Sequence, residues 1–220
     1  MMAREAPPRR TQAERRSESE EALLGAAAAL IAERGVERAS LASIGRSAGA
    51  SRGLPTHHFG SKDALVARLA ERVQDHVAAS VGDVLEARTD GEDDDELSIL
   101  DVLRTTLDTY LRMFEDPIAE ERALIVMWGA TFPSNASIDG MVEADRRAYD
   151  GWADLIRNGQ QDGSIRDDVD ATASAVALFG LMRGVAALLL TESDIIDMAN
   201  VRETCDRWIV GALAPHAEPD

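Results

Sequence analysis

Basic and hydrogen-bonding side chains gather in ASRGLPTHHFGSKDAL, residues 50–65 of a chain of 220. Arg52 offers a planar guanidinium, which can donate to two acceptors at once. Thr56 and His57 add a hydroxyl and an imidazole, and Lys62, the only lysine of the chain, adds an ammonium group. The chemistry that these side chains offer is binding of anions, such as phosphate, and of hydrogen-bond acceptors, such as the edges of bases.

Two short helices are expected to position these side chains. Ser40 predicts the N-cap of the first helix, and Gly49 predicts the turn that follows it. Ser51 is expected to cap the second helix, and the small residues Gly45 and Ala48 let the two helices cross closely. Two short helices joined by a glycine-containing turn form the helix-turn-helix signature, whose second helix enters the major groove of DNA.

Pro55 limits the second helix. A proline in a helix interior costs about 3 kcal/mol, because it lacks an N–H and clashes with the preceding turn. Most of that cost disappears in the first turn, where the backbone amides have no partner within the helix. We therefore expect a helix of one or two turns that carries Pro55 near its N-terminus and exposes Ser51, Arg52, Thr56 and His57.

Lys62 stands at the start of the next helix, which Ser61 is expected to cap. Asp63 suits the positive end of a helix dipole, whereas a lysine does not. The position of Lys62 at this end of the helix is explained if its ammonium group and the helix N-terminus together bind one external anion, such as a DNA phosphate. The alternative is an incidental surface lysine.

The N-terminal residues 1–16, with two prolines and several arginines, predict a flexible basic arm. In SESE, Ser17 and Glu20 form a predicted capping box, so a helix is expected to begin at Ser17 and to end at Gly35. The expected division of the chain is this arm, a head over residues 17–66 that contains the helix-turn-helix and a larger helical part over residues 67–214.

Charge and composition separate this head from the rest of the chain. Residues 1–62 hold ten basic and seven acidic residues, a net charge of +3, which leaves −20 for the remainder of a chain whose total is −17. Only the head can approach phosphates without repulsion. The acidic run at residues 90–96 predicts a solvated loop. The single cysteine, Cys205, fits a reducing cytoplasm, and no signal segment or bilayer-spanning run is expected, since the apolar run at residues 175–182 stops at Arg183.

Residues 22–66 resemble the TetR family of transcriptional regulators in their order of apolar residues, Gly35, the Ala48-Gly49 turn and the closing HFGSK. The resemblance implies an all-α homodimer with an N-terminal three-helix DNA-binding head that contains the helix-turn-helix, and a larger C-terminal helical domain for ligand binding and dimerisation. Repression relieved by a small molecule is the usual mechanism in that family. No cofactor and no metal are implied.

Carried over by position, the residues expected at DNA are Ser40, Arg46, Ser51, Arg52, Thr56, His57 and Lys62. Arg52 is expected to read a base and the others to hold phosphates. His58 and Phe59 are expected to pack between helices. One departure concerns Pro55 and Thr56, which stand where the family has an aliphatic residue followed by a phosphate-binding tyrosine. That contact is therefore either shortened to the Thr56 hydroxyl or lost.

Further helices are expected over residues 97–115, 118–132, 138–161, 171–192 and 198–214. The resemblance places eight aromatic or methionine residues on helices that line a ligand pocket: Tyr110, Met113, Phe114, Met127, Trp128, Phe132, Trp152 and Phe179. The alternative for each is plain core packing. Glu120, Glu121 or Asp145 would pair with a cationic ligand if buried, so the pattern leaves the small-molecule class open.

The segment DGSIRDDVDATASAVALFGLMRGV resembles the family's approach to its penultimate helix, which pairs with its copy in a second subunit as part of a four-helix bundle. Residues 175–190 are apolar around most of the helix, and Gly180, Gly184 and Leu188 are the expected interface residues. The alternative is an ordinary buried core helix.

The leading hypothesis is a ligand-released repressor that binds a palindromic operator in double-stranded DNA as a cytoplasmic homodimer. The alternative is a helical protein-binding module with a degenerate DNA-binding head. An enzyme is not expected, because the sequence has no glycine-rich phosphate loop, no cysteine and histidine cluster and no serine elbow.

Overall fold

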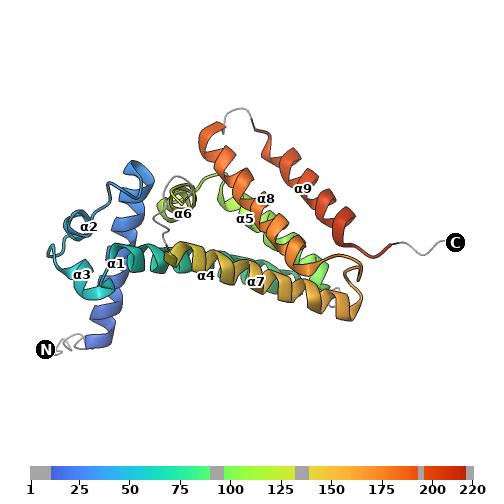
Figure 1. The fold of residues 1–220 in the computed structure, drawn as a ribbon, viewed down its shortest axis with the longest axis horizontal. Coiled ribbons are helices and arrows are strands. Elements are labelled where there is room, and N and C mark those ends of the chain that lie inside the picture. The colour runs from blue at the N-terminus through green and yellow to red at the C-terminus, as the bar shows by residue number, and fades with distance from the viewer. Residues whose placement is uncertain (1–10, 90–96, 132–138, 193–195, 217–220) are drawn as a thin grey trace, which may run out of the picture.

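The computed structural model describes residues 11–89, 97–131, 139–192 and 196–216 (Figure 1). This part of the chain holds nine α-helices and no strand, so the all-α fold class is confirmed. The helices are α1 (Gln12–Arg34), α2 (Leu41–Ser47), α3 (Leu54–Phe59), α4 (Lys62–Thr89), α5 (Ile99–Met113), α6 (Ala119–Gly129), α7 (Asp139–Asp162), α8 (Ala171–Glu192) and α9 (Met198–Leu213).

The first helix begins earlier than the sequence analysis predicts. Thr11 is the N-cap of α1: its hydroxyl accepts from the Glu14 amide at 3.2 Å, and the Glu14 carboxylate accepts from the Thr11 amide at 2.7 Å. The prediction of an arm through residue 16 and a cap at Ser17 was therefore wrong, because TQAE is a capping box as good as SESE and stands six residues before it. Residues 1–10 lie outside the described part. The predicted end is confirmed by Gly35, whose φ of 80° places it in the left-handed region.

One of the two predicted helix-turn-helix caps is confirmed. The Ser40 hydroxyl accepts from the Ser43 amide at 3.2 Å and caps α2. Ser51 does not cap α3, which begins at Leu54 with Gly53 as N-cap and no side-chain hydrogen bond. Pro55 accounts for the difference, because a proline is accommodated in the first turn of a helix and α3 accordingly begins right beside it.

Pro55 is also buried, against the helix that precedes the turn. A Cβ added to Gly45 would lie 2.7 Å from the Ser51 carbonyl oxygen and 3.2 Å from Cδ of Pro55. Gly45 thus permits the close crossing of α2 and α3, as predicted, and the proline ring fills the space beside it. Pro55 is a packing residue of the helix-turn-helix as well as the start of α3.

Two hydrophobic clusters form the core. The first joins α1, α2 and the start of α4 with α6 and the start of α7, through residues such as Leu23, Ile44, Leu69, Leu124 and Met141. The second joins α5, α7, α8 and α9. α4 contributes to both, with Leu69 in the first and Val77 against the second. Because α6 packs on α1, the core does not stop at residue 66, and the predicted domain boundary there stays a prediction.

Figure 1 shows α1, α2 and α3 together at the end of the molecule near the N-terminus, whereas α8 and α9 lie toward the C-terminal end. α4 and α7 pack against each other and run between the two ends. The expected helices of the C-terminal part are confirmed within three residues at each end, and α8 has the predicted bounds. The acidic run at residues 90–96 lies outside the described part.

Among the described helices, residues 171–191 of α8 are apolar and long enough to cross a bilayer by length and composition. Core helices of soluble proteins pass the same test, so this is weak evidence for a membrane. Arg183, within this segment, is 2% exposed and ion-paired to α7. A buried ion pair between two helices of one chain fits a helix packed in protein.

Candidate functional site

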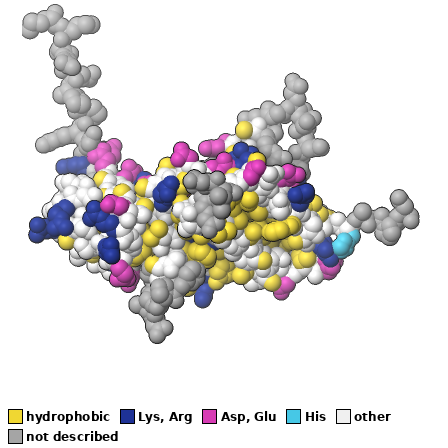
Figure 2. All heavy atoms as spheres, turned by 90° about the horizontal axis from the view of Figure 1, so that it is seen from above, with side chains coloured by type: hydrophobic (Ala, Val, Ile, Leu, Met, Phe, Trp, Pro, Cys, Tyr) yellow, Lys and Arg dark blue, Asp and Glu magenta, His cyan; other side chains and the backbone are white. Residues whose placement is uncertain are grey.

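The residues predicted to bind DNA lie on α2, α3 and the segments beside them, which we call the basic surface. Six of the seven are exposed and Lys62 is half-buried. Figure 2 shows dark-blue Arg and Lys side chains gathered at this end of the molecule. The helices therefore bring these side chains to one accessible end, as the helix-turn-helix pattern requires.

Lys62 has a partner within the protein. Its Nζ donates to the Glu37 carbonyl oxygen at 3.4 Å, which joins the start of α4 to the loop after α1. The Ser61 hydroxyl accepts from the Ala64 amide at 3.1 Å, so the predicted cap of α4 is confirmed. Binding of a DNA phosphate by Lys62 stays a prediction.

A cavity of about 450 Å³ lies between α4, α5, α7 and α8, with one residue from α6; we call it the ligand cavity. Most of its wall is apolar, and side chains such as Val77, Val81, Leu155 and Met182 line it. The volume is within the range of small-molecule sites, which are mostly apolar with a few polar groups that fix orientation.

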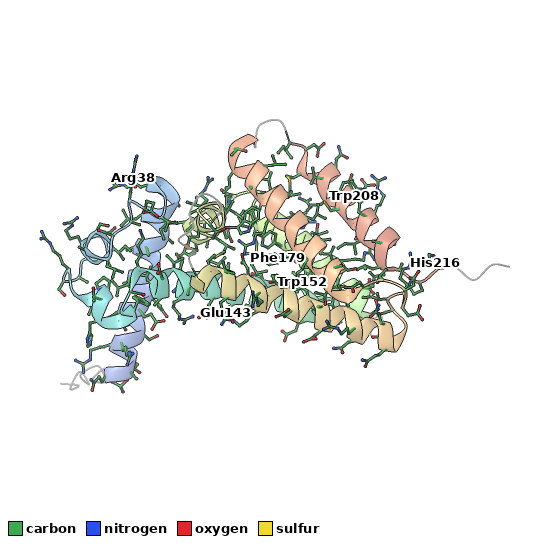
Figure 3. All side chains as sticks on the ribbon, viewed as in Figure 1. Arg38, Glu143, Trp152, Phe179, Trp208 and His216 are labelled. Atoms are coloured by element: carbon green, nitrogen blue, oxygen red, sulfur yellow. The ribbon has the colours of Figure 1, made fainter. Side chains whose placement is uncertain are left out.

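Three of the eight predicted ligand residues line this cavity: Tyr110, Trp152 and Phe179. Figure 3 shows Trp152 of α7 and Phe179 of α8 in the space between these two helices. Four others belong to or pack against the hydrophobic clusters and do not line the cavity: Met113, Phe114, Met127 and Trp128. Phe132 lies outside the described part of the chain.

Arg183 is a buried, charged cavity residue that the sequence analysis did not predict there. It is 2% exposed, its Nη2 donates to Oδ1 of Asp145 at 2.8 Å, and its Cζ lies 4.9 Å from the centre of the Phe179 ring. The guanidinium is thus held by an ion pair and a cation–π contact. The sequence signal was present, since Arg183 is the single charged residue in the apolar stretch at residues 175–190.

Burial sets the protonation of the groups around this arginine. It raises the pKa of Tyr110 to about 12, against the opposing effect of the Arg183 charge, so the phenol stays a neutral donor at ordinary pH. Burial likewise raises the pKa of Asp145, and Arg183 opposes the rise. Because Asp145 is already paired, it is not a free carboxylate for a cation.

Glu121 is buried and holds the start of α6. Its Oε2 accepts from the Ile118 amide at 2.8 Å, and its Oε1 lies 3.9 Å from Nε2 of His76 on α4. Burial raises the pKa of this carboxyl, and the hydrogen bond from Ile118 and the nearby His76 oppose the rise. Glu121 does not line the ligand cavity, and its hydrogen bond from the Ile118 amide gives it a structural role at the start of α6.

An apolar surface lies on the outside of α8 and α9, and we call it the α8/α9 face. Val176, Leu188 and Trp208 are 50%, 52% and 61% exposed. A Cβ added to Gly180 or Gly184 would meet no atom within 4 Å. Figure 2 shows yellow hydrophobic side chains gathered along the side of the molecule that carries these helices.

Comparison with known proteins agrees with this geometry. Residues 23–69 match the model of the bacterial regulatory proteins, tetR family. Over 200 residues the chain is 28% identical to the HTH-type transcriptional regulator CymR of Pseudomonas putida, a match that covers 90% of this chain and 92% of the relative.

Solved structures share the fold. A TetR-family transcriptional regulator structure from Rhodococcus sp. superposes with a TM-score of 0.76 at 22% identity, over 90% of this chain and all of that one. A transcriptional regulator from Saccharomonospora viridis, solved in complex with choline, gives a TM-score of 0.63 at 24% identity, over 91% of this chain and 100% of that one.

Proposed function

Because the chain belongs to the tetR family of bacterial regulatory proteins and is a transcriptional regulator with a DNA-binding helix-turn-helix, we propose that it is a repressor released by a small molecule. It binds a palindromic operator as a homodimer. The observation that carries the proposal is that one helix, α4, starts beside the basic surface at Lys62 and forms a wall of the ligand cavity farther along.

The basic surface supports the DNA part of the proposal. α3 is the recognition helix, and Arg52, just before it, is exposed and suited to guanine, whose two major-groove acceptors match a guanidinium. Ser40, Arg46 and Lys62 flank the helix and hold phosphates. The net charge of +3 over residues 1–62 favours this end over the acidic remainder.

The ligand cavity supports the effector part. α4 supplies Gln74, Val77 and Val81 to its wall, and Leu124 of α6 closes another side. α6 packs on α1, and Arg68 of α4 donates to Glu20 of α1 at 2.8 Å. A ligand that displaces α4 or α6 therefore changes the packing of the helices that carry α2 and α3.

The expected coupling between the two sites is modest. Two heads must lie about 34–36 Å apart to enter successive major grooves of an operator. A ligand that favours a different spacing weakens DNA binding, and coupling energies of this kind are typically about 1–3 kcal/mol. That corresponds to roughly a 5- to 150-fold loss of DNA affinity.

The α8/α9 face supports the homodimer. Large apolar side chains that a monomer leaves exposed are typical of subunit interfaces, and Leu188 and Trp208 are such residues. Gly180 and Gly184 leave room for a partner helix, because no atom of the described residues lies within 4 Å of a Cβ added at either position.

The test is footprinting of the purified protein on DNA that spans its own promoter and the neighbouring intergenic regions, titrated with salt. We expect a protected palindrome and a steep decrease of affinity with salt, because phosphate contacts release counterions. A folded dimer that protects no sequence above non-specific DNA would contradict the proposal and favour a protein-binding module.

A further inference from the structure

Three buried polar atoms lack a hydrogen-bond partner among the described residues: Nε2 of Gln74, the hydroxyl of Tyr110 and Nη1 of Arg183. They come from α4, α5 and α8, yet all three side chains line the ligand cavity. Tyr110 is 4% exposed and Arg183 is 2% exposed. The side chains that carry the unpartnered atoms thus line one cavity, from three different helices.

Such a group of atoms needs an explanation. Folded proteins give nearly all of their buried polar groups a partner, because an unpaired one loses its water without replacing it. The other polar groups around the cavity follow that rule: Nη2 of Arg183 donates to Asp145, and the Thr106 hydroxyl donates to the Val102 carbonyl at 2.8 Å. Three unpaired atoms on side chains that line the same cavity therefore point to a ligand that supplies their partners.

The chemistry of the three atoms defines that ligand. An amide nitrogen and a guanidinium nitrogen only donate, and the high pKa of Tyr110 keeps its hydroxyl protonated. All three can donate, so the group that satisfies them together is an acceptor. A carboxylate has two such oxygens, and its charge suits the guanidinium, whose second nitrogen is unpaired.

A cationic ligand fits this wall poorly. Asp145 is already bound to Arg183, and the buried Glu121 does not line the cavity. Asp75 and Arg147 do line it, but both are exposed, and Arg147 is itself paired to Glu71 at 2.6 Å. An ammonium group placed beside these side chains would meet the donors of Gln74 and Arg183 and the charge of Arg183.

We propose, building on the proposed function, that the effector is a mainly apolar compound with one carboxylate. Arg183 and Tyr110 hold the carboxylate, with the Gln74 amide as a third donor. The apolar part lies against Val81, Trp152, Leu155, Phe179 and Met182.

The probes are three carboxylates of different shape: decanoate, 3-phenylpropionate and 2-naphthylacetate. Each is compared with the primary amide and the primary amine of the same skeleton, by calorimetry on the purified full-length protein. We expect at least one carboxylate to bind, its amide to bind about tenfold more weakly or worse because the charge-assisted hydrogen bonds are lost, and no amine to bind. Failure of all three carboxylates, or an amine that binds more tightly than its carboxylate, would overturn the carboxylate class.

Tyr110→Phe tests the site itself, because it removes only the unpaired hydroxyl. We expect about tenfold weaker binding of the carboxylate, with the Tm of the ligand-free protein unchanged or raised. The matched control is Tyr149→Phe, which changes the only other tyrosine, on α7 and outside the cavity wall, and should leave affinity unchanged.

The double variant Arg183→Met with Asp145→Asn removes the cation without leaving its carboxylate unpaired. We expect it to abolish carboxylate binding. Unchanged affinity in both this variant and Tyr110→Phe would show that the carboxylate binds elsewhere and would overturn the site.

Footprinting with and without the bound carboxylate separates this inference from the proposed function. Operator protection together with no carboxylate binding refutes the ligand class alone. Carboxylate binding that depends on Tyr110 and Arg183, without release of DNA, supports the ligand class and refutes ligand-released repression.

Discussion

Arg52 and Lys62 lie on the same basic surface, but their chemistry predicts different parts in DNA binding. Arg52→Ala should remove base readout, so we expect a loss of about 1–3 kcal/mol that relaxes preference at one operator position. Lys62→Ala should weaken binding to all sequences alike and reduce the salt slope by about one. Competition binding against operator variants at several salt concentrations measures both effects.

Arg207→Ala is the control for that pair, because Arg207 is an exposed arginine on α9, away from the basic surface. It should leave operator affinity unchanged. Equal and sequence-independent losses for Arg52→Ala and Lys62→Ala would remove Arg52 from base readout.

Glu121 predicts a pH dependence of stability. Burial raises its folded pKa above the ordinary value of 4.5, so the folded chain binds this proton more tightly than the unfolded chain. Its contribution to the free energy of unfolding therefore falls as pH rises from about 4.5 through the raised pKa, and stays lower above it. Glu121→Gln keeps an acceptor for the Ile118 amide without this loss.

We therefore expect Glu121→Gln to gain stability relative to the parent between pH 4 and pH 7, as urea unfolding at the two pH values would measure. Glu120→Gln, at the half-buried neighbouring position, is the comparison. A variant that loses more stability at pH 7 than at pH 4 would show that His76 pairing outweighs the burial of the charge.

At the scale of helices, the close crossing of α2 and α3 rests on Gly45. A Cβ at Gly45 would lie 2.7 Å from a backbone oxygen, which cannot move without shifting the turn. We expect Gly45→Ala to destabilise the protein by about 1–3 kcal/mol despite the higher helix propensity of alanine. For a chain of this size each kcal/mol lowers the Tm by about 2–4 °C, measured by calorimetry.

Gly53→Ala supplies the matched comparison, since an added Cβ there meets nothing within 4 Å and the φ of −89° suits alanine. It should leave the Tm unchanged or slightly raised. A Gly45→Ala variant as stable as Gly53→Ala would mean that the crossing of α2 and α3 is looser than the structure has it.

For the whole molecule, Gly184→Leu tests the proposed dimer. An added Cβ at this position meets no described atom of its own protomer within 4 Å, and leucine favours helix, so the protomer should fold. In the dimer the new side chain would hold the partner helix away. We expect sedimentation to show a shift from dimer toward the monomer mass of 23.7 kDa.

Gly151→Leu makes the same change in α7, at an exposed glycine with open space around it. This variant should sediment as the parent does. A Gly184→Leu protein that stays dimeric would place the interface elsewhere on the molecule.

Sequence alone determined the local structure, because caps, turns and helical spacing act between residues a few positions apart. Ser40, Gly35 and the bounds of α8 were predictable for this reason, and so was the short helix at Pro55. The error at the start of α1 was also local. Thr11 and Ser17 each begin a possible capping box, and nothing in the sequence pattern favours one box over the other.

Only the tertiary structure decided which side chains share a cavity. Gln74, Tyr110 and Arg183 stand on three helices far apart in the chain, and whether their polar atoms are buried depends on how those helices pack. The same packing lets Tyr110 line the cavity, whereas Phe114, the C-cap of α5 one turn later, is buried in the core and does not line it. Hydrophobic spacing identifies the buried face of a helix, but it does not say what that face encloses.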